Sequence, residues 1–217
     1  MQQVSEREFV PAAGRDVFLP LYDPLVSLMG FDRARQELIA AAKIEPDHHI
    51  LDIGCGTGSF VVLLKRQYPQ VRVVGLDPDP KALRRAKSKI RRAGFSVQLD
   101  EGFSDELPYE TAVFERVFSS FMFHHLEGAE REKTMREALR VLKPGGSFHL
   151  FDFVADRAPR GFLERLIHSH AHLEDNSNEQ ILAELNHAGF TNATRVKHDS
   201  MFFGLLRTAY YRASVSR

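Results

Sequence analysis

The sequence contains a single cysteine, Cys55, and no excess of either sign of charge. One cysteine cannot form a disulfide within the chain, which fits a reducing compartment. Lysines and arginines together number 29, and so do aspartates and glutamates. General nucleic-acid binding depends on a basic excess, so we expect no nucleic-acid partner.

Long apolar stretches are also missing. No segment has about 18 consecutive apolar residues, so no membrane span is expected. The N-terminus lacks the apolar stretch of a signal peptide. The sequence also holds no internal repeat and no low-complexity tract. These absences together favour a cytoplasmic protein.

What the sequence does contain is a regular alternation of short apolar runs and amphipathic stretches. Its 217 residues, 43% of them hydrophobic and 27% charged, suffice for one domain with a full core. We expect strands at 49–54, 71–77, 95–99, 112–120 and 147–153. We expect helices at 59–69, 78–95, 130–146 and 177–189, and a Pro-Gly-Gly segment ends the helix at 130–146. Strands that alternate with helices of this length predict a parallel sheet.

Two of the expected helices carry clear end signals. Asp79 stands as the N-cap of the second helix, Pro80 occupies its first position, and Gly94 follows its end. Ser177 and Gln180 have the spacing of a capping box. These signals predict where each helix begins or ends, in addition to predicting that a helix forms.

The remaining segments lie outside this alternation. Strand-like runs near 193–198 and 205–213 have no long helix between them, so we expect this last pair to be antiparallel. Residues 1–45 are expected to form a helical cap, and residues 154–176 a helical insertion. Both would cover the carboxyl ends of the strands, where open α/β sheets bind ligands.

The first expected strand runs into a glycine turn, "LDIGCGTGSF", with Gly54, Gly56 and Gly58 at alternate positions. Glycines allow a sharp turn and let a ligand approach the backbone, and the following helix offers free N–H groups. Asp77 ends the second strand, where a carboxylate can accept hydrogen bonds from ribose hydroxyls. The dinucleotide fingerprint needs its third glycine at position 59, which is Ser59, so an NAD-dependent oxidoreductase is disfavoured but stays open. A tight turn without any ligand is the plainer alternative.

Several motifs together resemble the class I S-adenosylmethionine-dependent methyltransferases. They are "ILDIGCGTGSF", "VVGLDPDP", "LPY", "FMFHHL" and "EALRVLKPGGSFHLFDF", in the order seen in that family, and the resemblance covers roughly residues 15–215. The chain is most similar to the methyltransferase-11 group, which includes ubiquinone and menaquinone biosynthesis methyltransferases and many small-molecule methyltransferases. The resemblance implies a Rossmann-like, seven-stranded, mostly parallel sheet with an antiparallel last strand and helices on both faces. It makes residues 1–217 a single methyltransferase domain.

The resemblance also implies a cofactor, S-adenosyl-L-methionine, with S-adenosyl-L-homocysteine as its product, and a set of cofactor-binding positions. These are Tyr22 as a lid contact, Asp52, Gly54, Cys55, Gly56 and Gly58 against the methionyl part, Asp77 on the ribose, Pro78, Phe103 and Ser104 near the adenine, and Ser119 at the end of the fourth strand. Phe103 is a departure, because relatives commonly have an aspartate there that binds the adenine amino group. A phenyl ring can pack on adenine but cannot accept that hydrogen bond.

The sequence holds no unambiguous catalytic signature, because methyl transfer from a sulfonium needs a general base only when the nucleophile must lose a proton. His124, His125 and Asp152 are the candidate catalytic residues, each with a structural alternative. His168 and His172 share a helical spacing that suits a metal, but we expect no metal site. We expect a monomer or homodimer acting on a small organic acceptor. The rival from another class is a cofactor-binding regulatory partner that transfers no methyl group.

Overall fold

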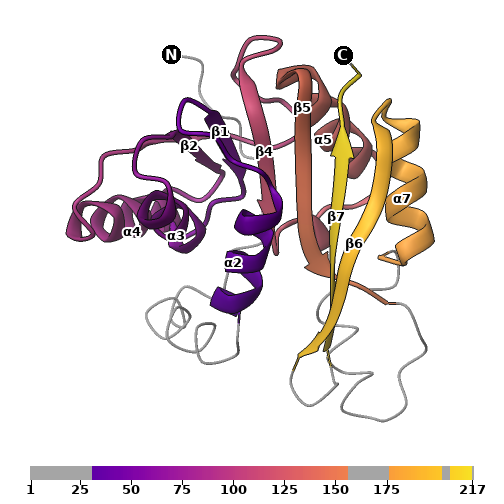
Figure 1. Cartoon of the computed structure of the whole chain (residues 1–217), viewed down its shortest axis with the longest axis horizontal. Helices are drawn as coiled ribbons and strands as arrows, with labels where there is room; N and C mark the ends of the chain where they lie inside the picture. Colours follow the sequence, from indigo (N-terminus) through magenta and orange to yellow (C-terminus); the bar gives the residue numbers. More distant parts are fainter. Residues whose placement is uncertain (1–30, 156–175, 202–205, 217) are drawn as a thin grey trace.

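A computed structural model describes residues 31–155, 176–201 and 206–216, and its core is a single seven-stranded sheet (Figure 1). The strand order is β3-β2-β1-β4-β5-β7-β6. The strands are β1 (His49–Ile53), β2 (Arg72–Asp77), β3 (Gln98–Glu101), β4 (Phe114–Ser120), β5 (Leu142–Phe153), β6 (Thr191–Met201) and β7 (Leu206–Ser214). Strands β1 to β5 pair in parallel, whereas β7 is antiparallel to both β5 and β6. The predicted fold class is therefore confirmed, including the antiparallel last strand.

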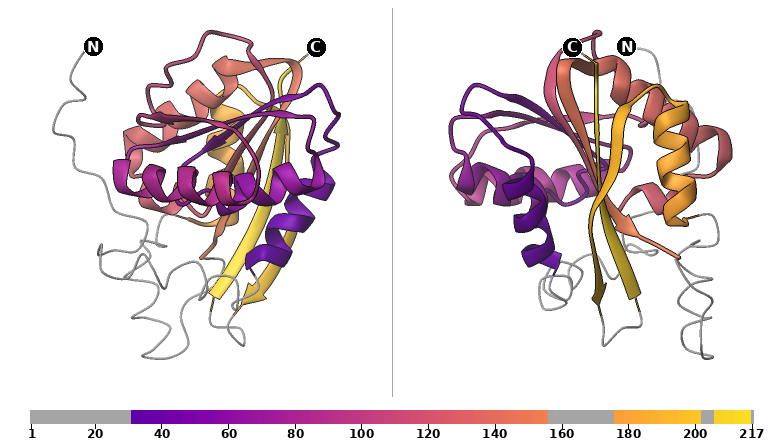
Figure 2. Two further views of the ribbon diagram at one scale, coloured as in Figure 1. Left: turned by 90° about the vertical axis from the view of Figure 1, so that its left-hand side faces the viewer. Right: turned by 45° about the vertical axis from the view of Figure 1, so that its right-hand side comes forward.

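Helices cover both faces of the sheet (Figure 2). Their bounds are α2 (Phe31–Ala41), α3 (Ser59–Gln67), α4 (Pro80–Arg92), the short 3-10 helix η2 (Phe123–His125), α5 (Gly128–Val141) and α7 (Asn178–His187). Helices α2, α3 and α4 share one apolar core with the sheet, and α5 and α7 share the other. The central parallel strands are thus shielded from water on both sides, whereas the edge strand β6 is largely exposed.

The predicted helix caps are present. The Asp79 side chain accepts a hydrogen bond from the backbone N–H of Lys81 at 2.7 Å, and Gly94 has a φ of +83°. The Ser177 hydroxyl accepts from the backbone N–H of Gln180 at 3.2 Å. Both ends satisfy backbone donors that a helix cannot pair internally.

Several elements differ from their expected bounds, most clearly β3 and the junction between α5 and β5. Strand β3 begins three residues later than predicted, because the backbone N–H of Phe95 bonds the carbonyl of Ile90 and closes α4 instead of starting a strand. Helix α5 ends at Val141, before the Pro-Gly-Gly segment, and β5 starts directly at Leu142. Leu142 pairs with Phe114, and a bulge in the ladder accommodates the segment that follows.

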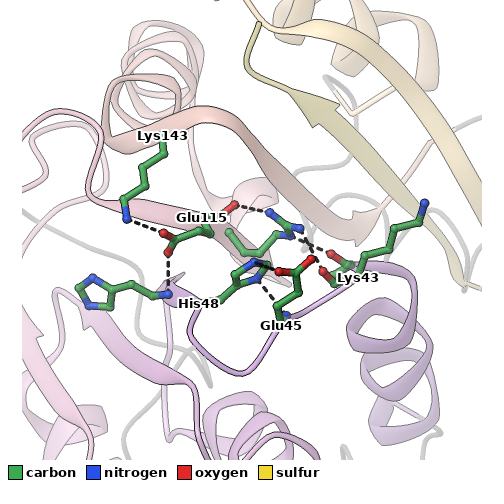
Figure 3. A network of polar contacts seen from close by, with 8 residues as sticks. Lys43, Glu45, His48, Glu115 and Lys143 are labelled. Carbon is green, nitrogen blue, oxygen red and sulfur yellow. Dashed lines mark hydrogen bonds and ion pairs between the residues drawn. The ribbon is translucent and has the colours of Figure 1, made fainter. Parts of the chain in front are cut away.

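A polar network fastens the α2–β1 connection to the amino end of the sheet (Figure 3). The Arg116 guanidinium donates to the carbonyls of Ala42 and Lys43 at 2.8 and 3.0 Å. Glu115 pairs with Lys143 and accepts from the backbone N–H of His49 at 2.7 Å. This edge is opposite the carboxyl ends of the parallel strands, so it supports the fold from the side away from the cavity described next.

Candidate active site

A cavity of about 530 Å³ opens at the carboxyl ends of the parallel strands. Four connections build its wall: the glycine loop after β1, the β2–α4 junction, the loop after β3, and the turn after β4. The lining residues include Arg35, Gly54, Cys55, Gly56, Thr57, Asp77, Pro78, Asp79, Phe103, Ser104, Asp105, Ser120, Phe121, Met122 and His125. Its volume falls in the range of pockets that hold small ligands.

The glycine loop takes a conformation that favours glycine at each of its three positions, with φ values of +71°, +53° and +77° at Gly54, Gly56 and Gly58. A Cβ on Gly54 would lie 2.4 Å from Cγ of Met122, so this glycine lets the Met122 side chain pack against the loop. A Cβ on Gly56 would meet no atom within 4 Å. The Gly56 backbone therefore faces open space beside the cavity.

Asp77 joins the glycine loop to the start of α4. Its Oδ2 accepts from the backbone N–H of Gly56 at 2.8 Å, and its Oδ1 accepts from the backbone N–H of Asp79 at 2.9 Å. Burial raises the pKa of Asp77 to about 6, although these two hydrogen bonds oppose the rise. Each oxygen keeps a further lone pair, so the carboxylate can still accept hydrogen bonds from a ligand.

Asp52 lies beneath the loop rather than on the cavity wall. It is 1% exposed, and neither carboxyl oxygen has a hydrogen-bond partner among the described residues. Burial raises the pKa of Asp52 to about 8, with the charge of Arg35 opposing the rise and that of Asp77 adding to it. Burial therefore favours the protonated form of this carboxyl, against the opposing charge of Arg35.

Arg35 is a wall residue that we did not predict from the sequence. It projects from α2, is 8% exposed, and its guanidinium carbon lies 5.8 Å from the centroid of the Phe121 ring. The signal for it was present: Arg35 shares the buried face of α2 with Leu38, Ile39 and Ala42, at helical spacing. A cation on the apolar face of an amphipathic helix indicates a polar site beneath it.

The loop after β3 supplies Phe103, Ser104 and Asp105 to the wall. The Ser104 hydroxyl is hydrogen-bonded to the Thr134 hydroxyl of α5 at 2.8 Å, which fixes this part of the loop. Pro78 lines the wall as well. The predicted adenine-binding set of Pro78, Phe103 and Ser104 is thus brought to one cavity, although ligand contact by these residues stays a prediction.

At the end of β4, the side chain that lines the cavity is not the one that we expected. Ser119, the predicted cofactor neighbour, is fully buried and does not line the cavity, whereas the adjacent Ser120 does. Phe121 follows with a φ of +56°, an uncommon conformation for a residue with a Cβ. This turn directs Phe121 and Met122 to the cavity wall.

The three catalytic candidates separate into two groups. His124 and Asp152 pair with each other: Nδ1 lies 2.6 Å from Oδ1, and Oδ2 accepts from the backbone N–H of His124 at 3.0 Å. They are 6% and 0% exposed, and neither lines the cavity. His125 does line it. Among the three, His125 alone is placed to reach a substrate in the cavity directly.

Some predicted residues lie outside the described part of the chain. They are Tyr22 of the expected cap and His168 and His172 of the expected insertion. The division of the chain into cap, domain and insertion likewise stays a prediction. Within the described residues, no helix is long and apolar enough to cross a membrane.

Comparison with known proteins agrees with this geometry. Residues 50–146 match the family described as "Methyltransferase domain". The matched stretch is less than half of the 217 residues, and it includes the glycine loop and Asp77. The match agrees with the resemblance to the methyltransferases noted in the sequence rather than with the oxidoreductase alternative.

One curated relative is a demethylmenaquinone methyltransferase from Deinococcus radiodurans, 36% identical over 137 residues, which are 62% of this chain and 56% of the relative. The chain therefore spans little more than half the length of that protein. Among solved structures, the YcgJ protein of Bacillus subtilis superposes with a TM-score of 0.73 at 18% identity, covering 85% of this chain and 99% of that one. A phosphoethanolamine N-methyltransferase of Haemonchus contortus, solved with S-adenosylhomocysteine, has a TM-score of 0.71 at 16% identity, covering 85% and 53%.

Proposed function

We propose that the chain transfers the methyl group of S-adenosylmethionine to a small organic acceptor. The observation that carries this proposal is the Gly56–Asp77 arrangement: an open glycine backbone held by a carboxylate that also lines the cavity. A nucleoside ligand matches it, because ribose hydroxyls donate hydrogen bonds and glycines permit close approach.

The residues at the site fit this cofactor in three respects. Asp77 offers acceptor lone pairs for the ribose hydroxyls, and Pro78 and Phe103 offer apolar surface for the adenine. Arg35 offers a cation for a carboxylate such as that of the methionyl part. S-adenosylmethionine supplies a methyl group already activated on a sulfonium.

The chain's own task is then to position two reactants and exclude water. Phe121, Met122 and Leu126 give the wall near the β4 turn an apolar character. Orientation of the acceptor against the methyl group can contribute roughly 7–11 kcal/mol to lowering the barrier. We assign His125 as the general base that takes a proton from the molecule to be methylated, because His125 lines the cavity.

We assign His124 and Asp152 a positioning role. The Asp152 carboxylate holds both the ring and the backbone N–H of His124, which is the central residue of η2. The same short helix carries His125, and Met122 immediately precedes it. The buried pair therefore fixes the turn that lines the cavity.

For the acceptor we propose a quinone-like aromatic molecule. Its support is the name of the relative from Deinococcus radiodurans, together with the aromatic and apolar side chains Phe121, Met122 and Leu126 at the cavity wall. The second candidate function is a cofactor-binding partner without turnover. Phe103 favours it, because a phenyl ring cannot accept a hydrogen bond from the adenine amino group.

Titration calorimetry and a turnover assay test the proposal. S-adenosylhomocysteine should bind with measurable heat at micromolar concentrations. Radiolabelled methyl groups should pass to a demethylated naphthohydroquinone, whose electron-rich ring carbon attacks the methyl group and then loses a proton. Absence of binding at high micromolar concentration would refute the cofactor assignment. Binding without turnover across quinone, phenol and amine acceptors would instead support the partner role.

A further inference from the structure

Helix α4 has an unusual distribution of charge. Its 13 residues, PKALRRAKSKIRR, include seven lysines and arginines and no acidic residue, although the whole chain has a formal net charge of zero. The inward face consists of Ala82, Ala86 and Ile90, which are all buried. Arg84, Lys87 and Arg91 share the opposite, exposed face, at the spacing of one helical stripe.

The charge continues onto the neighbouring helix. Helices α3 and α4 lie side by side on one face of the sheet (Figure 2), and α3 also lacks acidic residues. Nζ of Lys65 in α3 lies 6.0 Å from the centroid of the Phe95 ring just after α4, so the last turns of the two helices meet. Arg66 is exposed at that end of α3. We call Arg66, Arg84, Lys87, Arg91 and Arg92 the basic face.

Lys89, Arg91 and Arg92 lie in the last turn, where the helix dipole favours a cation, but the rest of the charge does not serve the stability of the helix. Lys81–Arg85, Arg85–Lys89 and Lys87–Arg91 are like-charge pairs four residues apart, and each weakens a helix. Lys81 also sits in the first turn, where the helix dipole disfavours a cation. Among the described residues, no carboxylate forms an ion pair with Arg84, Lys87 or Arg91. An anionic surface outside the chain would supply the opposite charge that the described residues do not.

We propose that the basic face docks onto an anionic lipid bilayer. The choice of lipid rests on the proposed function, because an apolar quinone acceptor dissolves in a bilayer and the enzyme must reach it there. A membrane surface attracts clustered lysines and arginines with no need for apolar insertion. That fits a face whose exposed side chains are charged rather than apolar.

The position of the face suits this task. Asp79 caps the first turn of α4 and also lines the cavity, so the cavity lies at one end of the helix that carries the basic face. A 13-residue helix is about 20 Å long, so a bilayer against α4 lies within one helix length of the site. Binding of single-stranded nucleic acid, by contrast, uses aromatic side chains interleaved with the cations, and α4 has none.

Co-sedimentation with vesicles tests the proposal, using the full chain and its triple variant R84Q/K87Q/R91Q. Wild type should bind phosphatidylglycerol vesicles, fail to bind pure phosphatidylcholine vesicles, and lose binding as salt is raised. The triple variant should bind about 100-fold more weakly, at roughly five-fold per removed charge. Glutamine is a good helix former, so α4 is retained.

A matched variant, K133Q/R136Q/R195Q, removes three exposed cations from α5 and β6 and should keep its vesicle affinity within about two-fold of wild type. S-adenosylhomocysteine binding should be unchanged in both variants, which separates this proposal from the cofactor assignment. The proposal is overturned if wild type ignores phosphatidylglycerol vesicles or if both variants lose binding equally. Tight binding of duplex or single-stranded RNA that depends on Arg84, Lys87 and Arg91, without vesicle binding, also overturns it.

Discussion

Asp77 gives the sharpest test of the site, because its two oxygens hold the glycine loop and, in the proposed function, also bind the ribose. Replacing it by asparagine keeps the shape but removes the charge and turns one acceptor into a donor. The amide NH2 would then face the backbone N–H of either Gly56 or Asp79, which now lie 2.8 and 2.9 Å from the carboxylate. One of the two hydrogen bonds by which Asp77 links the glycine loop to the start of α4 would be lost.

The expected magnitudes differ for binding and stability. Two hydrogen bonds from ribose to a charged acceptor contribute about 2–4 kcal/mol to cofactor affinity, or roughly 30- to 900-fold in Kd. The free energy of unfolding should change less. Burying the charge of Asp77 costs free energy, which is why its pKa is raised. Asp77→Asn removes that cost, and this gain offsets part of the stability lost with the backbone hydrogen bond.

Calorimetry with S-adenosylhomocysteine and thermal unfolding measure the two effects separately. Glu101→Gln is the matched control, since Glu101 pairs with Asp77 in register on the neighbouring strand, is exposed, and does not line the cavity. If Asp77→Asn and Asp77→Ala both stay folded and bind within about three-fold of wild type, a change worth less than 1 kcal/mol, the ribose assignment is wrong.

The pH dependence has opposite signs for binding and stability. Because the ionised carboxylate is the better acceptor, cofactor affinity should fall as pH drops through about 6. The folded state holds its proton more tightly than the unfolded state, whose Asp pKa is near 3.8. The free energy of unfolding should therefore decrease as pH rises from about 4 to 6, and Asp77→Asn should remove that contribution.

Three further changes separate packing, positioning and recognition. Gly54→Ala should lower stability by about 1–3 kcal/mol in thermal unfolding because its Cβ overlaps Met122, whereas Gly56→Ala should mainly weaken S-adenosylhomocysteine binding; equal stability losses would contradict this reading. Asp152→Asn should lower kcat and should lower the free energy of unfolding by about 1–3 kcal/mol, while the apparent pKa of the pH–rate profile stays unchanged. A pH–rate profile in which one limb is shifted or lost would make the pair part of the proton transfer. Phe103→Asp should tighten S-adenosylhomocysteine binding by about 1 kcal/mol, roughly five-fold, and the gain should vanish with S-inosylhomocysteine, whose base lacks the amino group. A gain that persists with the inosine compound would place Phe103 away from the adenine amino group.

The sequence predicted the fold, which is confirmed, and it named several residues that the structure brings to the cavity, because both depend on local patterns. The glycine loop, the acidic end of β2 and the helix caps are each encoded within a few residues. What it could not predict is which of two adjacent side chains faces the cavity. Ser119 and Ser120 differ by one position in β4 and so point to opposite faces, and apolar residues surround both.

The same limit explains the histidine pair. "FMFHHL" places two histidines near the site, but only the path of the chain through Phe121 and η2 turns His125 toward the cavity and His124 toward Asp152. That partner is 28 residues further along the chain, on β5, and joins His124 only because β4 and β5 are neighbours in the sheet. The sequence positions of Asp152 and His124 are therefore as consistent with a buried structural pair as with a catalytic dyad. Exposure to the cavity, which is a tertiary property, is why we propose His125 for the proton transfer and the buried pair for positioning.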